Sequence, residues 1–295
     1  MMLDAYSLRT MRVDVDFSLA QTCAPAWWVG TRSPKQQWTS GTLATVGWHQ
    51  GKIVWRKVSQ PVPGLLQISG SAPVEGDVEW VENVLGIGTR LPHFEEPVLA
   101  GLAAEFSGLR PLSDGSLFDG IMTSIIGQSI SVAAAAVTQT KLASRFGAPV
   151  NLDGRDFWPL PTAAFLTDTS VDQIRESGVT WRRAAAIRDV AERQIRGDLP
   201  TDQDARTQPE AVVKALTGIP GIGRWTAESA VLWGVGAPNA HPTGDIALLR
   251  AAKAAYNLPE LALKELDALA EQWQPARSLA ARLLWTKLFG PAPSP

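Results

Sequence analysis

Hydrophobic and polar residues alternate along the first part of the chain, a pattern typical of β-strands with one buried face. The alternation covers four runs, at residues 12–17, 42–46, 52–58 and 65–70. Residues that favour turns separate the runs, among them Gly47, Gly51 and Pro61. Two short helices are expected next, one capped by Asp77 and one over residues 97–106. The pattern predicts a small α+β unit with an antiparallel sheet.

The hydrophobic period changes to that of an α-helix after Pro111. Phe118, Ile121 and Ile125 recur at helical spacing. Further helices are predicted at residues 132–146, 171–176, 182–196, 209–216, 224–235, 246–255, 260–272 and 276–288. Residues 198–207 are polar and contain proline, so we expect a connection there. The second part of the chain is therefore predicted to be all-helical.

The composition is that of a globular protein. Of the 295 residues, 45% are hydrophobic and 19% are charged, and the net charge is −2. This balance argues against a strongly basic nucleic-acid-binding surface, although backbone amides and a few arginines would still hold a phosphate. No run reaches the roughly 20 apolar residues of a membrane span, and the N-terminus lacks signal-peptide features. We expect a cytoplasmic protein.

Cysteine and histidine are too few for a metal cluster. Cys23 is the only cysteine, which excludes an internal disulfide and a four-cysteine zinc or iron–sulfur site. His49, His93 and His241 are scattered and form no metal-ligand pattern. Tryptophan is abundant, with 12 residues against 2 tyrosines. Most of these rings should lie in the core, although flat rings also suit base stacking.

The first candidate for chemistry is the sequence Pro-Gly-Ile-Gly at residues 220–223, between two predicted helices. Gly221 and Gly223 allow a tight turn and leave no side chain in the way of a ligand. The helix that follows presents unpaired N–H groups and the positive end of its dipole, which together suit an anion such as a DNA phosphate. An ordinary helix–turn–helix corner with a glycine C-cap explains the turn equally well.

The second candidate is Asp245, which opens the predicted helix at residues 246–255. Taken alone, it is explained as an N-cap, a position that aspartate often fills. Asp245 lies 20 residues after Trp225, separated by one apolar helix and a loop with Gly236 and Pro238. That loop can return the chain and place the carboxylate beside the turn at residues 220–223. A catalytic acid is therefore the competing interpretation.

Two distant segments carry a resemblance to a known family. LTGIPGIGRWTAESAVLWGVG, followed by HPTGDIALLRAA, resembles the helix-hairpin-helix DNA glycosylases with a Gly/Pro-rich loop and a following aspartate. Upstream, IIGQSISVA at residues 125–133 is similar to a segment of the 3-methyladenine DNA glycosylase II (AlkA-like) branch. Because both motifs occur in the family's order and the mixed N-terminal unit also fits, the resemblance spans nearly the whole chain.

The resemblance implies an α+β fold in which an antiparallel-sheet, TBP-like domain precedes an all-helical glycosylase body. We expect the sheet domain at residues 1–110 and the helical body at 111–290, with the helix-hairpin-helix at about 216–226. Residues 291–295, PAPSP, are expected to be a loose tail.

The resemblance also implies a catalytic role for Asp245. The family breaks the N-glycosidic bond, and a carboxylate facing the sugar stabilises the positive charge that develops there. In bifunctional relatives a lysine at the position of Trp225 attacks the sugar, which tryptophan cannot do. Lys214 and Lys287 do not match that position. We therefore predict a monofunctional enzyme that leaves an abasic site.

The remaining site predictions concern the base and the DNA backbone. The base pocket is predicted to include Trp225, Ser229 and Trp273; Ser229 and Ala276 replace aromatic residues of relatives, which implies a wider pocket. The matching backbone-binding positions are Gly221, Ile222, Gly223 and Thr226. The wedge that fills the gap after base flipping is predicted at Gln128 and Ser129, with Ile130 as an alternative because serine is small.

The leading hypothesis is a glycosylase that flips and excises alkylated, cationic bases such as 3-methyladenine and 7-methylguanine from damaged double-stranded DNA. The alternatives are a glycosylase for an oxidised or deaminated base and a non-catalytic helix-hairpin-helix DNA-binding protein. We expect a monomer with no obligate protein partner and no cofactor, associated with the nucleoid in a bacterium. A structural Na⁺ or K⁺ at the hairpin carbonyls near Gly218 and Gly221 is a further expectation from the resemblance.

Overall fold

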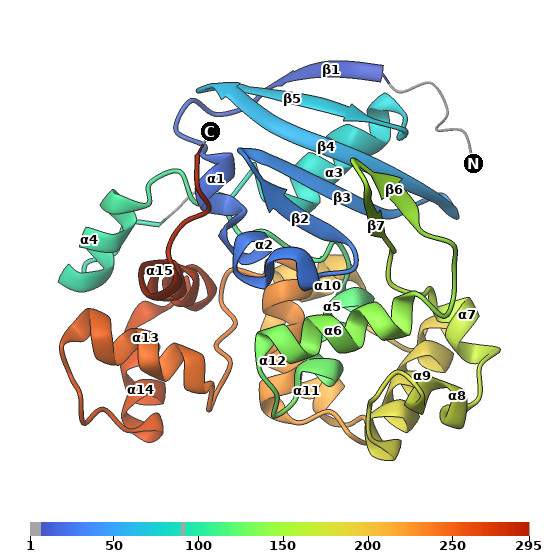
Figure 1. Ribbon diagram of the computed structural model, residues 1–295. Helices are drawn as coiled ribbons and strands as arrows, with labels where there is room; N and C mark the ends of the chain where they lie inside the picture. Colours follow the sequence, from blue (N-terminus) through green and yellow to red (C-terminus); the bar gives the residue numbers. More distant parts are fainter. Residues whose placement is uncertain (1–6, 90–91, 295) are drawn as a thin grey trace.

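The structure, a computed structural model, describes residues 7–89 and 92–294. It places a five-stranded antiparallel sheet over a largely helical body (Figure 1). The strands lie in the order β1-β5-β4-β3-β2. They are β1 (Ser7–Arg12), β2 (Gln36–Thr39), β3 (Thr42–His49), β4 (Lys52–Val62) and β5 (Leu65–Gly70). The predicted α+β class is confirmed.

The alternation seen in the sequence sets which face of the sheet is buried. Leu43 lies opposite Val58, and Val58 lies opposite Ile68 on the other neighbouring strand. All three side chains are fully buried. The three pair across adjacent strands of one buried face. This face packs on the helices α1 (Leu19–Thr22), α2 (Ala24–Val29) and α3 (Val74–Val84).

Two predictions in this part of the chain were wrong. The first strand ends at Arg12 instead of beginning there, and Phe17 donates its N–H to the Asp14 carbonyl in a turn. Asp77 lies inside α3, whose first residue follows Pro73. Its buried carboxylate accepts hydrogen bonds from Arg9 and, at 2.7 Å, from Arg56. Asp77 is therefore the centre of a buried ion pair, which a local capping pattern does not reveal.

The helical body contains most of the predicted helices within a few residues of their expected ends. Its members are α5 (Leu117–Gly127), α6 (Val132–Ala143), α7 (Ala163–Thr167), α8 (Val171–Arg175), α9 (Trp181–Arg196), α10 (Asp202–Thr207), α11 (Pro209–Thr217), α12 (Arg224–Val235), α13 (Ile246–Tyr256), α14 (Leu263–Ala270) and α15 (Arg277–Phe289). The polar connection predicted before α11 instead forms α10, because Thr201 and Asp204 make a capping box.

Helices α5 and α12 cross in close contact, and this crossing links the hairpin to the segment that follows α5. A side chain on Gly120 of α5 would come within 2.4 Å of the Ala230 carbonyl of α12, so the backbones of α5 and α12 touch. Because α5 ends at Gly127 and α12 begins at Arg224, this crossing brings residues 128–131, here called the wedge loop, close to the hairpin at residues 218–223. Gly120 is therefore a packing residue that fixes this distance.

The boundary predicted at residue 110 does not separate two packed units. Helix α4 (Pro97–Glu105) packs on α15, and Leu99 and Leu102 belong to the core of the helical body. In the other direction, the described part of the predicted loose tail returns to the sheet. Ala292 is buried in the sheet core, and the Trp38 indole donates to the Pro293 carbonyl at 2.9 Å. The tail is held there because the buried indole N–H needs an acceptor.

A small hairpin that the sequence pattern did not predict, β6 (Val150–Leu152) and β7 (Arg155–Phe157), also joins the two parts. Val150, Leu152 and Phe157 pack against Val46 and Trp55 of the main sheet. Within the described residues, no individual helix is long and apolar enough to cross a membrane, and the α5–α6 pair that passes jointly is bent by 117°.

Candidate functional site

The hairpin between α11 and α12 is a compact turn with an open tip. Ile219 and Ile222 are buried in the core, and the Ile222 N–H donates to the Ile219 carbonyl. Gly221 has a φ of +91°, and a side chain there would come within 2.8 Å of Ala186 on α9. Glycine is therefore required at this position both by the backbone conformation and by packing. The predicted backbone-binding role of Ile222 is limited, because both its side chain and its amide are used internally.

Gly223 is the part of the hairpin that remains open. It is exposed, it is the N-cap of α12, and it provides no side chain to that helix end. A side chain built on it would meet no protein atom within 4 Å. The first amides of α12 are therefore left for a ligand, together with the positive end of the helix dipole.

Gln128 holds the hairpin from behind. Its side-chain amide donates to the Gly221 carbonyl and to the Thr226 hydroxyl, both at 3.0 Å. Arg183 in turn donates to the Gln128 carbonyl. These bonds give Gln128 a role in positioning the hairpin, and the wedge role predicted for it stays a prediction. Thr226 is buried and pairs with Gln128, so its hydroxyl is not available to a phosphate.

The predicted cation site at the Gly218 and Gly221 carbonyls stays a prediction. The Gly221 carbonyl already faces the amide donor of Gln128. A carbonyl oxygen has two lone pairs, so this bond leaves one lone pair for a further partner. No step of the reaction is derived through a cation at these carbonyls.

Asp245 has two hydrogen bonds with different roles. Its Oδ1 accepts the Leu248 N–H at 2.7 Å, which makes Asp245 the N-cap of α13. Its Oδ2 accepts the indole N–H of Trp225 at 3.0 Å. The first contact is the structural role that the sequence suggested, and the second places the carboxylate beside the start of α12. The two interpretations of Asp245 are therefore geometrically compatible.

The other predicted pocket residues are placed differently. Trp225 is partly exposed and contacts Asp245, but Trp273 is only 1% exposed and Ser229 only 2%. Trp273 packs edge-on against His241, with ring centroids 6.1 Å apart. Both side chains lie in the core, and their predicted place in the base pocket stays a prediction. Ala276 is also buried.

The wedge loop presents Ser129 and Ile130 to the surface. Ser129 has a φ of +55°, a conformation that few residues other than glycine adopt, and it is exposed. Ile130, the next residue, is 38% exposed although it is strongly hydrophobic. Of the wedge candidates, the exposed pair is therefore Ser129 and Ile130.

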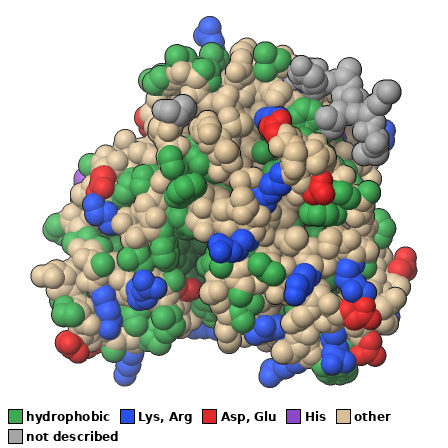
Figure 2. Space-filling view, in the orientation of Figure 1, with side chains coloured by type: hydrophobic (Ala, Val, Ile, Leu, Met, Phe, Trp, Pro, Cys, Tyr) green, Lys and Arg blue, Asp and Glu red, His purple; other side chains and the backbone are tan. Residues whose placement is uncertain are grey.

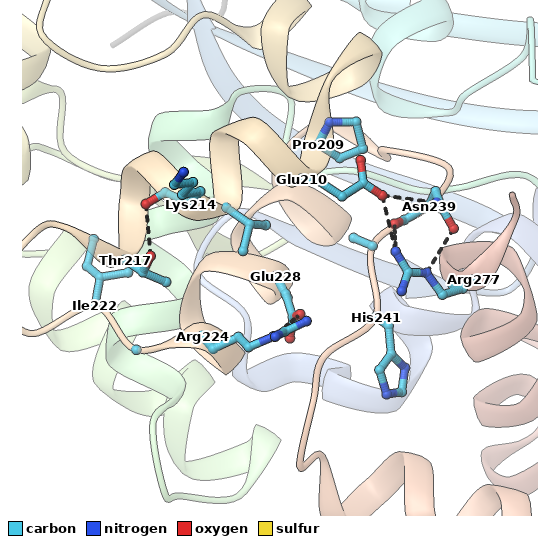
Figure 3. A pocket seen from close by; sticks show the side chains of 13 residues that line it. Pro209, Glu210, Lys214, Thr217, Ile222, Arg224, Glu228, Asn239, His241 and Arg277 are labelled. Atoms are coloured by element: carbon cyan, nitrogen blue, oxygen red, sulfur yellow. Dashed lines mark hydrogen bonds and ion pairs between the residues drawn. The ribbon is translucent and has the colours of Figure 1, made fainter. Parts of the chain in front are cut away.

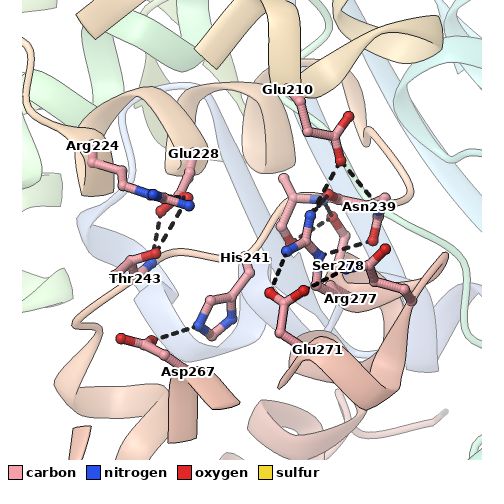
Figure 4. A network of polar contacts seen from close by, with 12 residues as sticks. Glu210, Arg224, Glu228, Asn239, His241, Thr243, Asp267, Glu271, Arg277 and Ser278 are labelled. Atoms are coloured by element: carbon pink, nitrogen blue, oxygen red, sulfur yellow. Dashed lines mark hydrogen bonds and ion pairs between the residues drawn. The ribbon is translucent and has the colours of Figure 1, made fainter. Parts of the chain in front are cut away.

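A polar network beside the hairpin was missed by the sequence interpretation (Figure 4). Buried Glu228 accepts the Thr243 amide at 2.7 Å and the Arg224 guanidinium at 2.8 Å. Nearby, His241 contacts Asp267 at 2.8 Å, and Arg277 pairs with Glu210 and Glu271. The local signal was the i, i+4 spacing of Arg224 and Glu228, which usually indicates a solvated surface pair.

Two hollows adjoin these residues. A cavity of about 550 Å³ lies between α11, the hairpin and the start of α15, with Lys214, Arg224, Glu228 and Arg277 among its walls (Figure 3). Asp245 is not one of its lining residues. Figure 2 shows a second hollow on the surface, between the part that carries α13 to α15 and the part that carries α6, α11 and α12.

No family profile matches the sequence. The DNA-3-methyladenine glycosylase 2 of Escherichia coli is 28% identical over 194 residues, which cover 66% of this chain and 66% of that protein. The 3-methyladenine DNA glycosylase of Archaeoglobus fulgidus has the same fold, with a TM-score of 0.80, 22% identity, and coverage of 96% of this chain and 99% of that one.

An 8-oxoguanine glycosylase/lyase of Clostridium acetobutylicum also shares the fold, with a TM-score of 0.73, 17% identity and coverage of 97% and 99%. At this identity the likeness establishes the fold alone. The sequence relatives distinguish between the branches, and the family predicted from the two motifs is confirmed. The chain is similar in sequence to the AlkA-like 3-methyladenine DNA glycosylases of the helix-hairpin-helix superfamily, and it shares their fold.

Proposed function

We propose that the protein is a monofunctional DNA glycosylase that excises alkylated, cationic bases from damaged duplex DNA. The observation that carries this proposal is the contact between Trp225 and Asp245 at 3.0 Å. It places a carboxylate next to the helix end that is best suited to hold a DNA phosphate. The proposed site therefore combines a helix end that binds the DNA backbone with a carboxylate that acts on the sugar.

In the proposed reaction, Asp245 acts on the sugar of the flipped nucleotide. Breaking the N-glycosidic bond builds positive charge on the sugar, and a fixed carboxylate stabilises that charge electrostatically. Each carboxylate oxygen has more than one acceptor site, so the bonds to Leu248 and Trp225 leave room for the sugar and for an attacking water. The same bonds fix the carboxylate plane before the substrate arrives.

Base recognition is proposed to depend on charge. Alkylation at purine N3 or N7 makes the base cationic, and a cation is attracted to the face of an indole by up to about 2 kcal/mol when desolvated. Trp225 is the partly exposed indole at the site. Ser229 and Ala276 add no aromatic surface, because both are small and buried. We therefore propose that the enzyme relies on the cationic state of the base more than on close shape matching.

The test is release of bases from methylated duplex DNA, followed by chromatography of the products. We expect free 3-methyladenine and 7-methylguanine, with no release from a matched duplex that carries 8-oxoguanine or uracil. Release of only the oxidised or deaminated base would replace the proposed substrate class. Binding without release of any base would identify a DNA-binding protein instead.

The absence of lyase activity is a separate prediction. An amine nucleophile is needed for a Schiff base with the sugar, and an indole nitrogen does not supply one. Lys287, a lysine of α15, is paired with Glu105 at 2.9 Å. We therefore expect abasic DNA with intact strands, and no covalent complex on borohydride treatment. A trapped complex with the purified enzyme would contradict the monofunctional assignment.

Ile130 is proposed to fill the space that the flipped base leaves, supported by Ser129. The wedge loop holds Ile130 at the surface, next to the hairpin that Gln128 fixes. Ile130→Ala is expected to lower the single-turnover excision rate by about tenfold, because less apolar surface replaces the lost stacking. Val137→Ala on α6, also an exposed apolar residue, is the control and should leave the rate unchanged. Equal rates for all three proteins would exclude Ile130 as the wedge.

A further inference from the structure

Glu228 is a buried carboxylate for which neither motif has a role. Its side chain is only 6% exposed, yet it lies one helical turn after Arg224, at the hairpin end of α12. An ionised carboxylate at such a depth is costly unless hydrogen bonds compensate for the lost water. Glu228 has three such bonds, and their partners show what it holds.

Two of the three bonds go to Thr243. The Thr243 amide donates to Oε2 at 2.7 Å, and the Thr243 hydroxyl contacts Oε1 at 3.2 Å. Thr243 lies two residues before Asp245, in the segment that enters α13 (Figure 4). Gly244 between them has a φ of +80° and no neighbour within 4 Å. Residues 243–245 are therefore held by Glu228, which bonds Thr243, and by Trp225, which bonds Asp245.

The third bond leads to the surface. Arg224 donates to Oε1 at 2.8 Å while its own side chain remains 70% exposed. It directly follows Gly223, the open position of the hairpin. Charge-assisted bonds of this kind are about twice as strong as neutral ones. Arg224 thus places a countercharge against Glu228, beside Thr243.

We propose that Glu228 is a positioning residue, which sets the place of Asp245 by holding Thr243, with Arg224 as its countercharge. This inference rests on the proposed catalytic role of Asp245. Arg224, Trp225 and Glu228, close together at the start of α12, then act jointly. Together they fix residues 243–245 relative to the hairpin. The amides proposed to bind the phosphate and the proposed catalytic residue Asp245 are therefore connected by side-chain hydrogen bonds as well as by the backbone.

Three measurements on one set of variants test the proposal. Glu228→Ala should speed amide hydrogen exchange in residues 243–248 by at least about tenfold, because the Thr243 bond is lost. The single-turnover excision rate should fall by about 10- to 100-fold, as expected for a misplaced catalytic group. Duplex binding should change little, because Gly223 and the helix amides are untouched. Glu228→Gln, which keeps the volume and one acceptor oxygen, should be intermediate.

Asp77→Asn is the matched control. Asp77 is also a buried carboxylate with arginine partners, but it lies in the sheet unit. It should lower thermal stability without changing the excision rate of the folded protein. Unchanged exchange in residues 243–248, or faster exchange with an unchanged rate, would overturn the role of Glu228. If the wild type releases no base, the proposed function fails, while the exchange comparison still decides whether Glu228 holds the loop.

Discussion

Asp245→Asn is expected to reduce base release from methylated duplex DNA by at least about 100-fold, the usual loss when a group that stabilises transition-state charge is removed. Asparagine keeps the size and a side-chain oxygen, so it can still accept the Leu248 amide at the start of α13. It is also as good an N-cap as aspartate. The substitution therefore removes the negative charge and the acceptor of the Trp225 indole, while it leaves the capping role in place.

Two accompanying measurements distinguish chemistry from structure. The melting temperature of Asp245→Asn should stay close to that of the wild type, and duplex binding should be equal or tighter, because a negative charge near the DNA is lost. Asp245→Ala removes the cap as well, so it should lose about 1 kcal/mol of stability in addition to activity. Base release by Asp245→Asn at the wild-type rate would show that Asp245 is only a cap.

The elements with strong local patterns were predictable from the sequence. Strand β5 (Leu65–Gly70) and helix α12 (Arg224–Val235) have the predicted ends, because hydrophobic period, turn residues and glycines agree there. Ser131 caps α6 by accepting the Ala134 amide. Where all local signals favour the same structure, long-range packing changes the ends of the element little.

The misplaced elements are those whose surroundings come from distant parts of the chain. Asp77 is an acid near a helix start, yet its partners are Arg9 and Arg56 on strands of the sheet. The tail follows the last helix and contains three prolines, yet its Pro293 carbonyl accepts the Trp38 indole N–H. Neither partner is encoded nearby, so local pattern and composition favoured the wrong structure in both cases.

The candidate site also contains both residues with a local sequence signal and residues whose surroundings come from distant parts of the chain. The 20-residue separation of Trp225 and Asp245, one helix and a returning loop, predicted that the carboxylate can lie beside the hairpin. In the structure Asp245 accepts the indole N–H of Trp225, two residues after the hairpin. Glu228 was missed because an Arg–Glu pair one turn apart usually lies on a solvated face. Its burial comes from Thr243, which approaches from the far end of the same loop. Trp273 and Ser229 are buried in the core, which their residue types alone did not predict.

Gly223→Ser is expected to weaken duplex binding by about tenfold while it leaves the fold intact. Gly223 is the N-cap of α12 in an ordinary extended conformation, and a side chain there meets no protein atom within 4 Å. Serine is a favourable N-cap, so stability should change by only a few tenths of a kcal/mol. The serine hydroxyl would bind the amides that the phosphate needs, and losing one charge-assisted bond costs about 1.5–3 kcal/mol.

The pattern of the loss identifies its cause. Binding should weaken equally for all sequences, and the salt dependence should keep its slope, because no lysine or arginine is removed. Gly147→Ser, an exposed glycine with open space after α6, is the matched control and should bind like the wild type. By contrast, Gly221→Ser should lose stability, since its φ is +91° and Ala186 lies in the way. Wild-type affinity in Gly223→Ser would mean that DNA is held elsewhere than at the hairpin amides.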